Sequence, residues 1–280
     1  MIVTAPASSA NLGPGYDCLA LALDLPFHLS VGGRADAAVS GAGRYHEAEP
    51  SHPCAVAFRE AGGDPSISLW WASPIPPGRG LGFSGAARVA GAYAAGLLDG
   101  LEDAEARSGA HRVASVLEGH PDNSAASSYG GFTVAVLDRV LRLDLPEGLA
   151  VVVWSPSTST STDASRRALA SRLPLSDAAF SVARAAAWVA ALATGELDVL
   201  REACEDRLHQ DLRLSARSDA REVRDHLLGR PEVLAAWLSG SGPSIAALVP
   251  SEVAPFAASS LPGDGTVRTL QVDGRGVSPA

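Results

Sequence analysis

Residues 76–87 form a glycine-rich run, Pro-Pro-Gly-Arg-Gly-Leu-Gly-Phe-Ser-Gly-Ala-Ala, whose residue types could bind phosphate. The run leaves a strand-like segment and opens an Ala- and Gly-rich helix expected from Gly85 to Leu98. N–H groups at a helix start carry partial positive charge, and glycines let an anion approach the backbone. Ser84 adds a hydroxyl for a phosphate oxygen or a hard cation. A glycine-rich connection into a tightly packed helix explains the isolated segment equally well.

A second turn, Asn11-Leu12-Gly13-Pro14-Gly15-Tyr16-Asp17, lies between two strand-like runs. Its glycines supply positive-φ positions, while Asn11 and Asp17 supply an amide and a carboxylate that could hold an amino or hydroxyl group. An ordinary hairpin is the favoured interpretation of this motif taken alone.

A third segment, Glu118-Gly119-His120-Pro121-Asp122-Asn123, places four polar groups at one helix break. Pro121 should end the preceding helix, and Asp122 or Asn123 could cap the next one. Glu118 has the hard oxygen atoms that Mg²⁺ prefers, and His120 with Asn123 can hold a small polar molecule. Taken alone, a helix cap beside a solvated histidine is the favoured alternative.

Two further features have weaker functional signals. On a helix expected from about Leu197 to Leu214, Asp206, His209 and Arg213 are spaced at i, i+3 and i+7 and would share a face. A solvated salt-bridge stripe is the default interpretation, and a bidentate carboxylate clamp by Arg213 is the functional one. A third glycine-rich turn, 238–244, is explained equally well as a hairpin loop.

The composition excludes several classes of protein. The 280 residues are 46% hydrophobic and 19% charged, too apolar for a disordered chain. A formal net charge of -9 and no local basic patch argue against nucleic acid and membrane surfaces as partners. All 22 cationic residues are Arg, which excludes sites that need a lysine, such as a Walker A loop or a Schiff-base enzyme.

The cysteines and the apolar segments predict a cytoplasmic protein. Cys18, Cys54 and Cys204 are too scattered for a disulfide framework or a Cys-x-x-Cys zinc pair. The segment 1–10 lacks the pattern of a signal peptide, and we expect no uncharged stretch of about 18 apolar residues to span a bilayer.

The elements that must position these motifs alternate between strands and helices, which predicts an α+β fold. One helix is expected to start near Ser176 or Asp177, to stop at Gly195 and to be mostly buried. The Ser- and Thr-rich segment 155–162 is a loop, and we expect two halves, 1–150 and 151–280, with a site in the cleft between them. Strands are expected at 1–5, 19–25, 67–71, 133–137, 149–154, 235–238 and 245–249.

The motifs, in this order, resemble those of the GHMP small-molecule kinases, and within them most closely the homoserine kinases. The likeness covers nearly the whole chain and rests on the segments 6–17 and 118–123 and on Asp206-Arg207-Leu208-His209-Gln210 followed by Arg213. It implies the GHMP kinase fold, which has two domains. The N-terminal domain, similar in fold to ribosomal protein S5, would bind ATP, and the C-terminal ferredoxin-like domain would complete the substrate cleft.

The resemblance also implies roles for individual residues. Mg²⁺ would be held by Ser84 and Glu118, and Asn123 would orient the acceptor hydroxyl, since no dedicated general base is evident. Thr162 and Arg166 would complete the cleft. L-homoserine would be bound by Asn11, Asp17, His120, Asn123 and Arg213, and ATP by Pro76, Gly78, Arg79, Gly80, Leu81, Gly82, Ser84, Gly85 and Ala86.

The nucleotide loop departs from the family pattern. The usual Gly-Leu-Gly-Ser-Ser-Ala-Ala is here Gly-Leu-Gly-Phe-Ser-Gly-Ala at 80–86, so one hydroxyl is lost while the metal-binding serine is kept. Phe83 would narrow the loop or stack near the nucleotide, and Gly85 would loosen the first helical turn. The expected activity is phosphorylation of L-homoserine in threonine biosynthesis by a homodimer. The alternatives are a GHMP kinase for another small amino alcohol or hydroxy acid, and a non-catalytic ATP-binding sensor.

Overall fold

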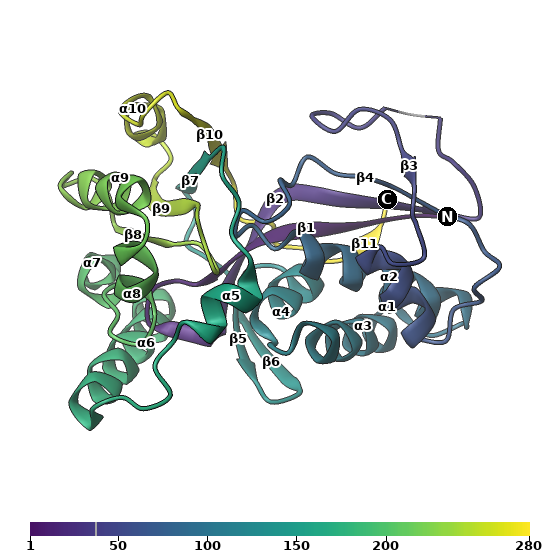
Figure 1. The fold of residues 1–280 in the computed structure, drawn as a ribbon, viewed down its shortest axis with the longest axis horizontal. Coiled ribbons are helices and arrows are strands. Elements are labelled where there is room, and N and C mark those ends of the chain that lie inside the picture. The colour runs from purple at the N-terminus through teal and green to yellow at the C-terminus, as the bar shows by residue number, and fades with distance from the viewer. Residues whose placement is uncertain (37) are drawn as a thin grey trace.

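The computed structural model describes residues 1–36 and 38–280, and its strands form two antiparallel sheets flanked by helices (Figure 1). The predicted α+β class is confirmed. The first sheet has the order β11-β1-β2-β4-β3, with β5 and β6 added from β2. Its strands are β1 (Ile2–Asn11), β2 (Gly15–Val31), β3 (His46–Glu47), β4 (Leu69–Ala72), β5 (Phe132–Val136), β6 (Arg139–Leu143) and β11 (Ser278–Pro279).

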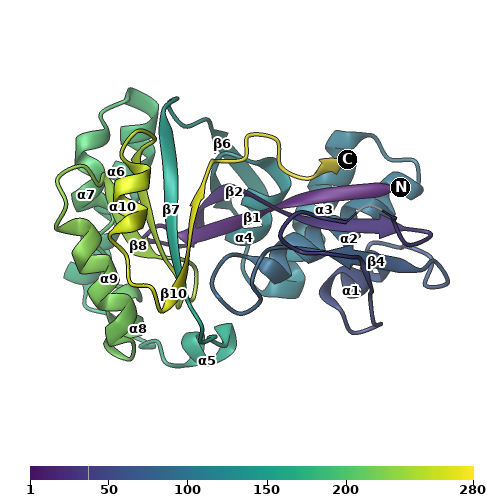
Figure 2. The same cartoon turned by 90° about the horizontal axis from the view of Figure 1, so that it is seen from above.

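The hairpin of β1 and β2 links the two ends of the molecule. Its register runs from Ile2 opposite Ser30 to Asn11 opposite Gly15, with irregularities after Pro6 and after Ala10. Proline has no N–H to donate to the ladder, which fits an irregularity at that point. Strand β1 runs from the end of the sheet near the chain termini toward the second half, and β2 runs back beside it (Figure 2). The predicted turn at 11–17 therefore lies at the junction of the two halves.

Helices cover one face of the first sheet (Figure 1). Helix α2 packs closely against α1 because of Gly91, where an added Cβ would lie 2.1 Å from the Cys54 carbonyl oxygen. The Ala- and Gly-rich sequence of α2 therefore fixes its distance from its neighbours and with it the position of its N-terminus. The helices are α1 (Pro53–Glu60), α2 (Phe83–Leu98), α3 (Asp103–Glu118) and α4 (Asp122–Tyr129).

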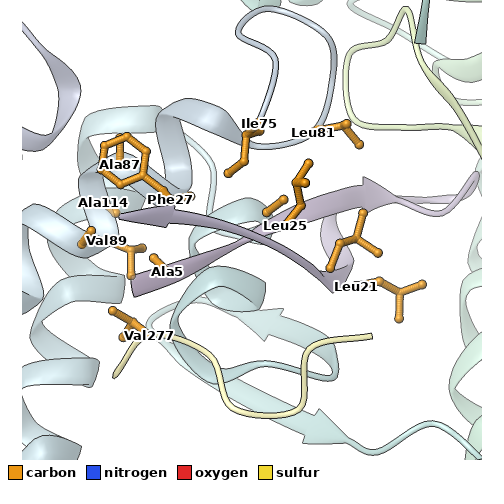
Figure 3. Close-up of a cluster of buried hydrophobic side chains, with 14 of the residues drawn as sticks. Ala5, Leu21, Leu25, Phe27, Ile75, Leu81, Ala87, Val89, Ala114 and Val277 are labelled. Carbon is orange, nitrogen blue, oxygen red and sulfur yellow. The ribbon is translucent and has the colours of Figure 1, made fainter. Parts of the chain in front are cut away.

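The main hydrophobic core lies between the first sheet and these helices (Figure 3). Phe27 from β2 and Val89 from α2 meet there, and Val277 joins from the end of the chain. The same cluster continues into the second half through Val151, Val153, Trp188 and Trp237. The two sheets therefore share one continuous core.

The second sheet has the order β10-β7-β9-β8, and a smaller core lies between it and its helices. Strands β7, β8 and β9 agree with the predicted runs, whereas β10, like β3, β6 and β11, was not predicted. The strands are β7 (Leu149–Pro156), β8 (Ala235–Leu238), β9 (Ile245–Pro250) and β10 (Gly265–Leu270). The helices of this half are α5 (Thr162–Arg167), α6 (Leu175–Thr194), η1 (Leu197–Val199), α7 (Leu200–Ala203), α8 (Gln210–Ser215), α9 (Ser218–Leu228) and α10 (Ala254–Ser259).

Helix α6 ends at Gly195 as predicted, but the prediction that most of it is buried is wrong. Only Ser181, Trp188, Ala191 and Leu192 are buried, and the Val182 side chain is 67% exposed. Alanines make the helix apolar by composition, yet only one face packs against the core. The helix begins at Leu175, directly after Pro174, slightly earlier than the predicted cap at Ser176 or Asp177.

Among the described residues, α6 is also the one helix apolar and long enough to cross a membrane by length and composition. This is weak evidence for a span. The helix carries Asp177 and Arg184 and has Trp188 in the core, packed edge to face on Trp237. We therefore interpret α6 as a peripheral helix of this fold.

The continuous helix predicted from about Leu197 to Leu214 is also wrong. The chain forms η1 and α7, leaves helical structure at Cys204, and starts again as α8 at Gln210. The side chain responsible is Asp206, whose contacts are described below.

The division into 1–150 and 151–280 stays a proposal. Strands β7 to β10 of the second sheet all lie after residue 148, which supports it. The chain then returns to the first sheet, where β11 pairs with β1 through Val3 opposite Pro279 and Thr4 opposite Ser278. The termini consequently lie side by side at the far end of the first sheet (Figures 1 and 2).

Candidate active site

The predicted motifs meet at one cleft between the two halves of the molecule. The cleft is bordered by the β1–β2 turn, the loop before α2, the α3–α4 break, α5, α8 and the β8–β9 loop. The side chains and backbone that line it belong to Asn11, Tyr16, Asp17, residues 78–84, Glu118, His120, Asp122, Asn123, Thr160, Thr162, Arg166, Arg213 and residues 240–242.

The loop before α2 can be built only with glycine at its key positions. Gly78, Gly80 and Gly82 have φ angles of 68°, 73° and 67°. A Cβ at Gly80 would lie 2.1 Å from the Ser239 carbonyl oxygen, and one at Gly82 would lie 2.0 Å from Ser8 Oγ. The backbone is therefore both left-handed and in close contact with its neighbours at these points.

The N-terminus of α2 faces this cleft without a side-chain cap. Gly82 occupies the cap position, and no side chain accepts a hydrogen bond from the first turn. The first N–H groups of a helix lack intrahelical partners and attract anions. The loop is also tied to the second half, since Arg79 Nη2 donates to the Ser157 carbonyl (2.6 Å) and the Gly78 carbonyl accepts from Thr160 N–H (2.9 Å).

The β8–β9 loop forms hydrogen bonds with the glycine-rich loop that precedes α2. Ser239 Oγ donates to the Gly80 carbonyl at 2.6 Å and lies 2.7 Å from Ser9 Oγ, which accepts from Trp237 Nε1 at 2.9 Å. Sequence reasoning gave this loop no role beyond a hairpin. Its Gly-Ser-Gly spacing at 240–242 was the available signal.

The structure brings together Ser84 and Glu118, which are distant in the sequence. Ser84 Oγ, in the first turn of α2, donates to Glu118 Oε1 at 2.7 Å. Glu118 is the last residue of α3, which Gly119 ends with a φ of 76°, and its side chain is only 6% exposed. Arg88, one turn after Ser84 on α2, forms an ion pair with the same carboxylate oxygen.

The α3–α4 break holds His120 and Asn123 at the cleft through Asp122. The Asp122 Oδ1 atom lies 2.7 Å from His120 Nδ1 and accepts from Asn123 N–H at 2.8 Å. Asp122 is the first residue of α4, and Pro121 occupies the cap position without a side-chain cap hydrogen bond, so the predicted cap by Asp122 or Asn123 is wrong. The amide of Asn123 accepts from Ser8 Oγ at 2.9 Å and donates from Nδ2 to Asp122 Oδ1 at 3.2 Å.

Asp17 lies in the β1–β2 turn and is paired across the cleft. Arg166 of α5 binds both of its carboxylate oxygens, with Nη1 to Oδ2 at 3.0 Å. The turn that presents Asp17 is held by Asn11, whose Oδ1 accepts from Asp17 N–H at 3.2 Å and whose Nδ2 donates to the Gly240 carbonyl at 3.0 Å. The hairpin interpretation and a functional one are therefore both compatible with this turn.

Arg213 is buried at the edge of the cleft. Its Nη1 lies 3.0 Å from His209 Nδ1 and 3.2 Å from the Gly240 carbonyl oxygen. The ring of Tyr16 lies 5.5 Å from the Arg213 guanidinium and 5.3 Å from that of Arg166. Tyr16 therefore contacts both cations. The motif 11–17 contains Tyr16, but its sequence carries no signal for this role.

The predicted stripe of Asp206, His209 and Arg213 on one helix face is wrong. The buried Asp206 carboxylate accepts from the N–H groups of Leu208, His209 and Gln210, each at 2.8 Å, and from Ser181 Oγ at 3.0 Å. A carboxylate that satisfies successive N–H groups offers the backbone an alternative to a continuous helix. Ser181 of α6 belongs to this cap through its hydroxyl.

His209 connects the corrected loop to the first motif. Burial lowers its pKa from 6.5 to about 4, so the ring is neutral near pH 7. Because Arg213 can only donate, His209 Nδ1 accepts, and the proton lies on Nε2, which donates to the Gly13 carbonyl at 2.8 Å. Gly13 is required there, since an added Cβ would lie 2.2 Å from the Cys204 carbonyl oxygen.

Phe83 and Gly85, the departures in the nucleotide loop, each have a packing partner. Phe83 meets Trp71 and Phe27 edge to face, at 5.6 and 5.7 Å between ring centroids, and still lines the cleft. A Cβ at Gly85 would lie 3.1 Å from Asn123 Cβ, so Gly85 allows α4 to approach α2. Pro76, Gly85 and Ala86 are not among the residues that line the cleft. Their predicted nucleotide contacts stay predictions.

Comparison with known proteins defines the class first. The family model for the GHMP kinases N terminal domain matches residues 51–131. The crystal structure of a homoserine kinase from Cytophaga hutchinsonii superimposes with a TM-score of 0.83 at 24% identity, covering 100% of this chain and 97% of that one. The fold is therefore that of the GHMP kinases.

Curated relatives narrow the assignment. A homoserine kinase from Thermus thermophilus is 40% identical over 250 residues, which are 87% of this chain and 85% of the relative. A homoserine kinase from Clavibacter michiganensis is 40% identical over 261 residues, 88% of this chain and 81% of the relative. The chain belongs to the homoserine kinase family of the GHMP kinases.

Proposed function

We propose that this chain transfers the γ-phosphoryl group of ATP to the side-chain hydroxyl of L-homoserine, a step of threonine biosynthesis. The observation that carries the proposal is the Ser84–Glu118 contact of 2.7 Å beside the uncapped N-terminus of α2. It puts two hard oxygen ligands next to a backbone cradle for phosphate. The curated homoserine kinases at 40% identity support the choice of acceptor.

The residues present fit a magnesium ion and a triphosphate. Mg²⁺ favours oxygen ligands, and a serine hydroxyl with a carboxylate on the cleft wall provides two of them. The left-handed glycine backbone at Gly80 and Gly82 allows close approach of an anion to the N–H groups. A bound Mg²⁺ would supply positive charge against the phosphate oxygens. Ser84 and Glu118 are accordingly our proposed metal ligands.

A second group of residues that line the cleft fits a zwitterionic amino acid. Asp17 supplies an anion for an ammonium group, and Arg166 and Arg213 supply cations for a carboxylate. In the structure Asp17 and Arg166 satisfy each other. A bound amino acid would replace that ion pair by one charge contact to each partner. Asn11 and His120 border the same space and complete our proposed acceptor site.

Asn123 lies between the two proposed subsites. Its Oδ1 is so close to the glycine loop that a Cβ added at Gly82 would lie 3.1 Å from it. An amide at this place can hold the acceptor hydroxyl in line without removing its proton beforehand. A loose transition state for phosphoryl transfer makes early deprotonation unnecessary, so positioning and charge carry most of the catalysis.

We place the enzyme in the cytoplasm, which the three free cysteines Cys18, Cys54 and Cys204 support. A homodimer stays a prediction. A kinase for another amino alcohol or hydroxy acid is the alternative, and a nucleotide-binding sensor is the second one, motivated by Phe83 on the cleft wall.

The deciding experiment incubates the purified protein with Mg-ATP and one acceptor at a time: homoserine, threonine, serine or mevalonate. We expect homoserine to give the fastest ADP release by a wide margin, with a phosphorylated product. Turnover only with another acceptor would support the first alternative. Nucleotide binding without turnover on any acceptor would support the sensor.

A further inference from the structure

Arg88 forms the ion pair with Glu118 that sequence reasoning did not anticipate. It lies four residues after Ser84, on the same face of α2, and its guanidinium contacts Glu118 Oε1, the oxygen that also accepts from Ser84. Helices α2 and α3, which carry the three residues, pack directly against each other (Figure 1). The Glu118 carboxylate is therefore already paired with a cation, the Arg88 guanidinium.

The ion pair is largely shielded from water. The Arg88 side chain is 21% exposed and that of Glu118 is 6% exposed. Burial lowers the pKa of Arg88, and its buried Nε has no hydrogen-bond partner in the described structure. Such an arginine depends on its carboxylate partner, because an unpaired buried charge is costly.

A divalent cation at Ser84 and Glu118 would compete with this arginine. Both cations would bind the same carboxylate group, and like charges repel strongly where water is excluded. Nucleotide phosphates change the balance, since they bring negative charge to the same place. The arginine and the metal therefore exclude each other more strongly before nucleotide arrives than after it.

We propose that Arg88 occupies Glu118 in the nucleotide-free protein and so makes the metal bind together with the nucleotide rather than before it. The inference rests on the proposed function, because it takes Ser84 and Glu118 as metal ligands. Arg88 is a positioning residue in this scheme. It holds the carboxylate toward Ser84 and blocks divalent ions when no phosphate is present.

The test is a titration of nucleotide-free protein with Mn²⁺, followed by the electron paramagnetic resonance signal of the free ion. Arg88→Met removes the charge and keeps much of the apolar stem, and we expect it to bind Mn²⁺ at least about tenfold more tightly than the unaltered protein. Exposed Arg112→Met on α3 makes the same change in net charge away from Glu118 and should leave the affinity unchanged. Adding Glu118→Gln to Arg88→Met should abolish the gain.

Unchanged or weaker Mn²⁺ binding by Arg88→Met would overturn the inference and leave Arg88 as a purely structural partner. Arg88→Gln is a second variant that removes the charge, and circular dichroism checks that it is folded. If neither variant folds, the unaltered protein decides, because tight Mn²⁺ binding without nucleotide contradicts the proposal and weak binding supports it. A separate arm tests the metal site itself: Glu118→Gln should weaken Mn²⁺ binding in the presence of a non-hydrolysable ATP analogue. An unchanged affinity there would contradict the proposed function instead.

Discussion

At the scale of single residues, the motifs predicted which residues could take part in a site, but not which other residues their side chains would contact. Ser84, Glu118, Asp17 and Arg213 all line the cleft, as the resemblance to the GHMP kinases implied, whereas each motif taken alone favoured or equally allowed a purely structural interpretation. The pairing of Asp17 with Arg166 depends on a contact across 149 positions of sequence. No local pattern contains such information.

Tyr16 is the residue whose role the contacts define best. The guanidinium groups of Arg166 and Arg213 lie 5.3 and 5.5 Å from the centroid of its ring, so the ring helps to hold two proposed carboxylate-binding groups in place. Cation–π contacts contribute about 0.5–2 kcal/mol. We expect Tyr16→Ala to raise KM for homoserine about tenfold and to change KM for ATP little, measured by steady-state kinetics.

Tyr16→Phe is the matched control for that prediction. It keeps the aromatic face and removes only the hydroxyl, so KM for homoserine should stay close to that of the unaltered protein. A rise with Phe as large as that with Ala would show that the hydroxyl matters and that stacking on the guanidinium groups does not.

At the scale of elements, apolar runs predicted the buried strands β7, β8 and β9 and short parts of the long strands β1 and β2, and Gly195 predicted the end of α6. Hydrophobic periodicity failed where a side chain competes with the backbone. Leu197 to Leu214 has an amphipathic helical pattern, but Asp206 accepts from three successive N–H groups and breaks it. It also failed for β6 and β10, whose residues are largely exposed or half-buried and lack a buried run.

The loop between α7 and α8 should make stability depend on pH through His209. Its pKa is about 4 in the folded protein and near 6.5 when the chain is unfolded, so the unfolded chain binds the extra proton between these values. The free energy of unfolding should therefore be full above pH 6.5 and fall as the pH drops toward 4. His209 contributes up to about 1.4 kcal/mol per pH unit, and burial gives His52 and His111 the same direction.

Urea unfolding at pH 7, 6 and 5 measures this dependence. His209→Gln should be less stable at pH 7 but should show a shallower loss with acidification than the unaltered protein. His226→Gln changes an exposed histidine and serves as the matched control, with an unaltered slope. A His209→Gln slope equal to that of the unaltered protein would contradict a buried, neutral His209.

At the scale of the whole molecule, the two halves are bound into one unit. One core contains Val3 and Phe27 of the first sheet together with Val153 and Trp237 of the second. The last strand crosses back to pair with β1, which the division of the sequence at residue 150 did not foresee. Residues of both halves consequently line the cleft, and the two halves share one hydrophobic core.

We expect one cooperative unfolding transition. Tryptophan fluorescence reports on Trp70 and Trp71 of the first sheet together with Trp154, Trp188 and Trp237 of the second half, and circular dichroism reports on the helices of both halves. The two should give coincident urea curves. Val277→Ala, which empties part of a fully buried site at the returning chain end, should shift both curves together by about 1–3 kcal/mol. Separate transitions for the two probes would show that the halves fold independently.

The most direct test of the account is phosphorus NMR of a reaction containing the protein, Mg-ATP and L-homoserine. Transfer to the side-chain hydroxyl predicts a new phosphomonoester signal, split by the two protons of the adjacent methylene group, that grows in step with ADP. Inorganic phosphate as the only other product, or a phosphorus signal without that coupling, would contradict the central claim that this cleft phosphorylates the hydroxyl of homoserine.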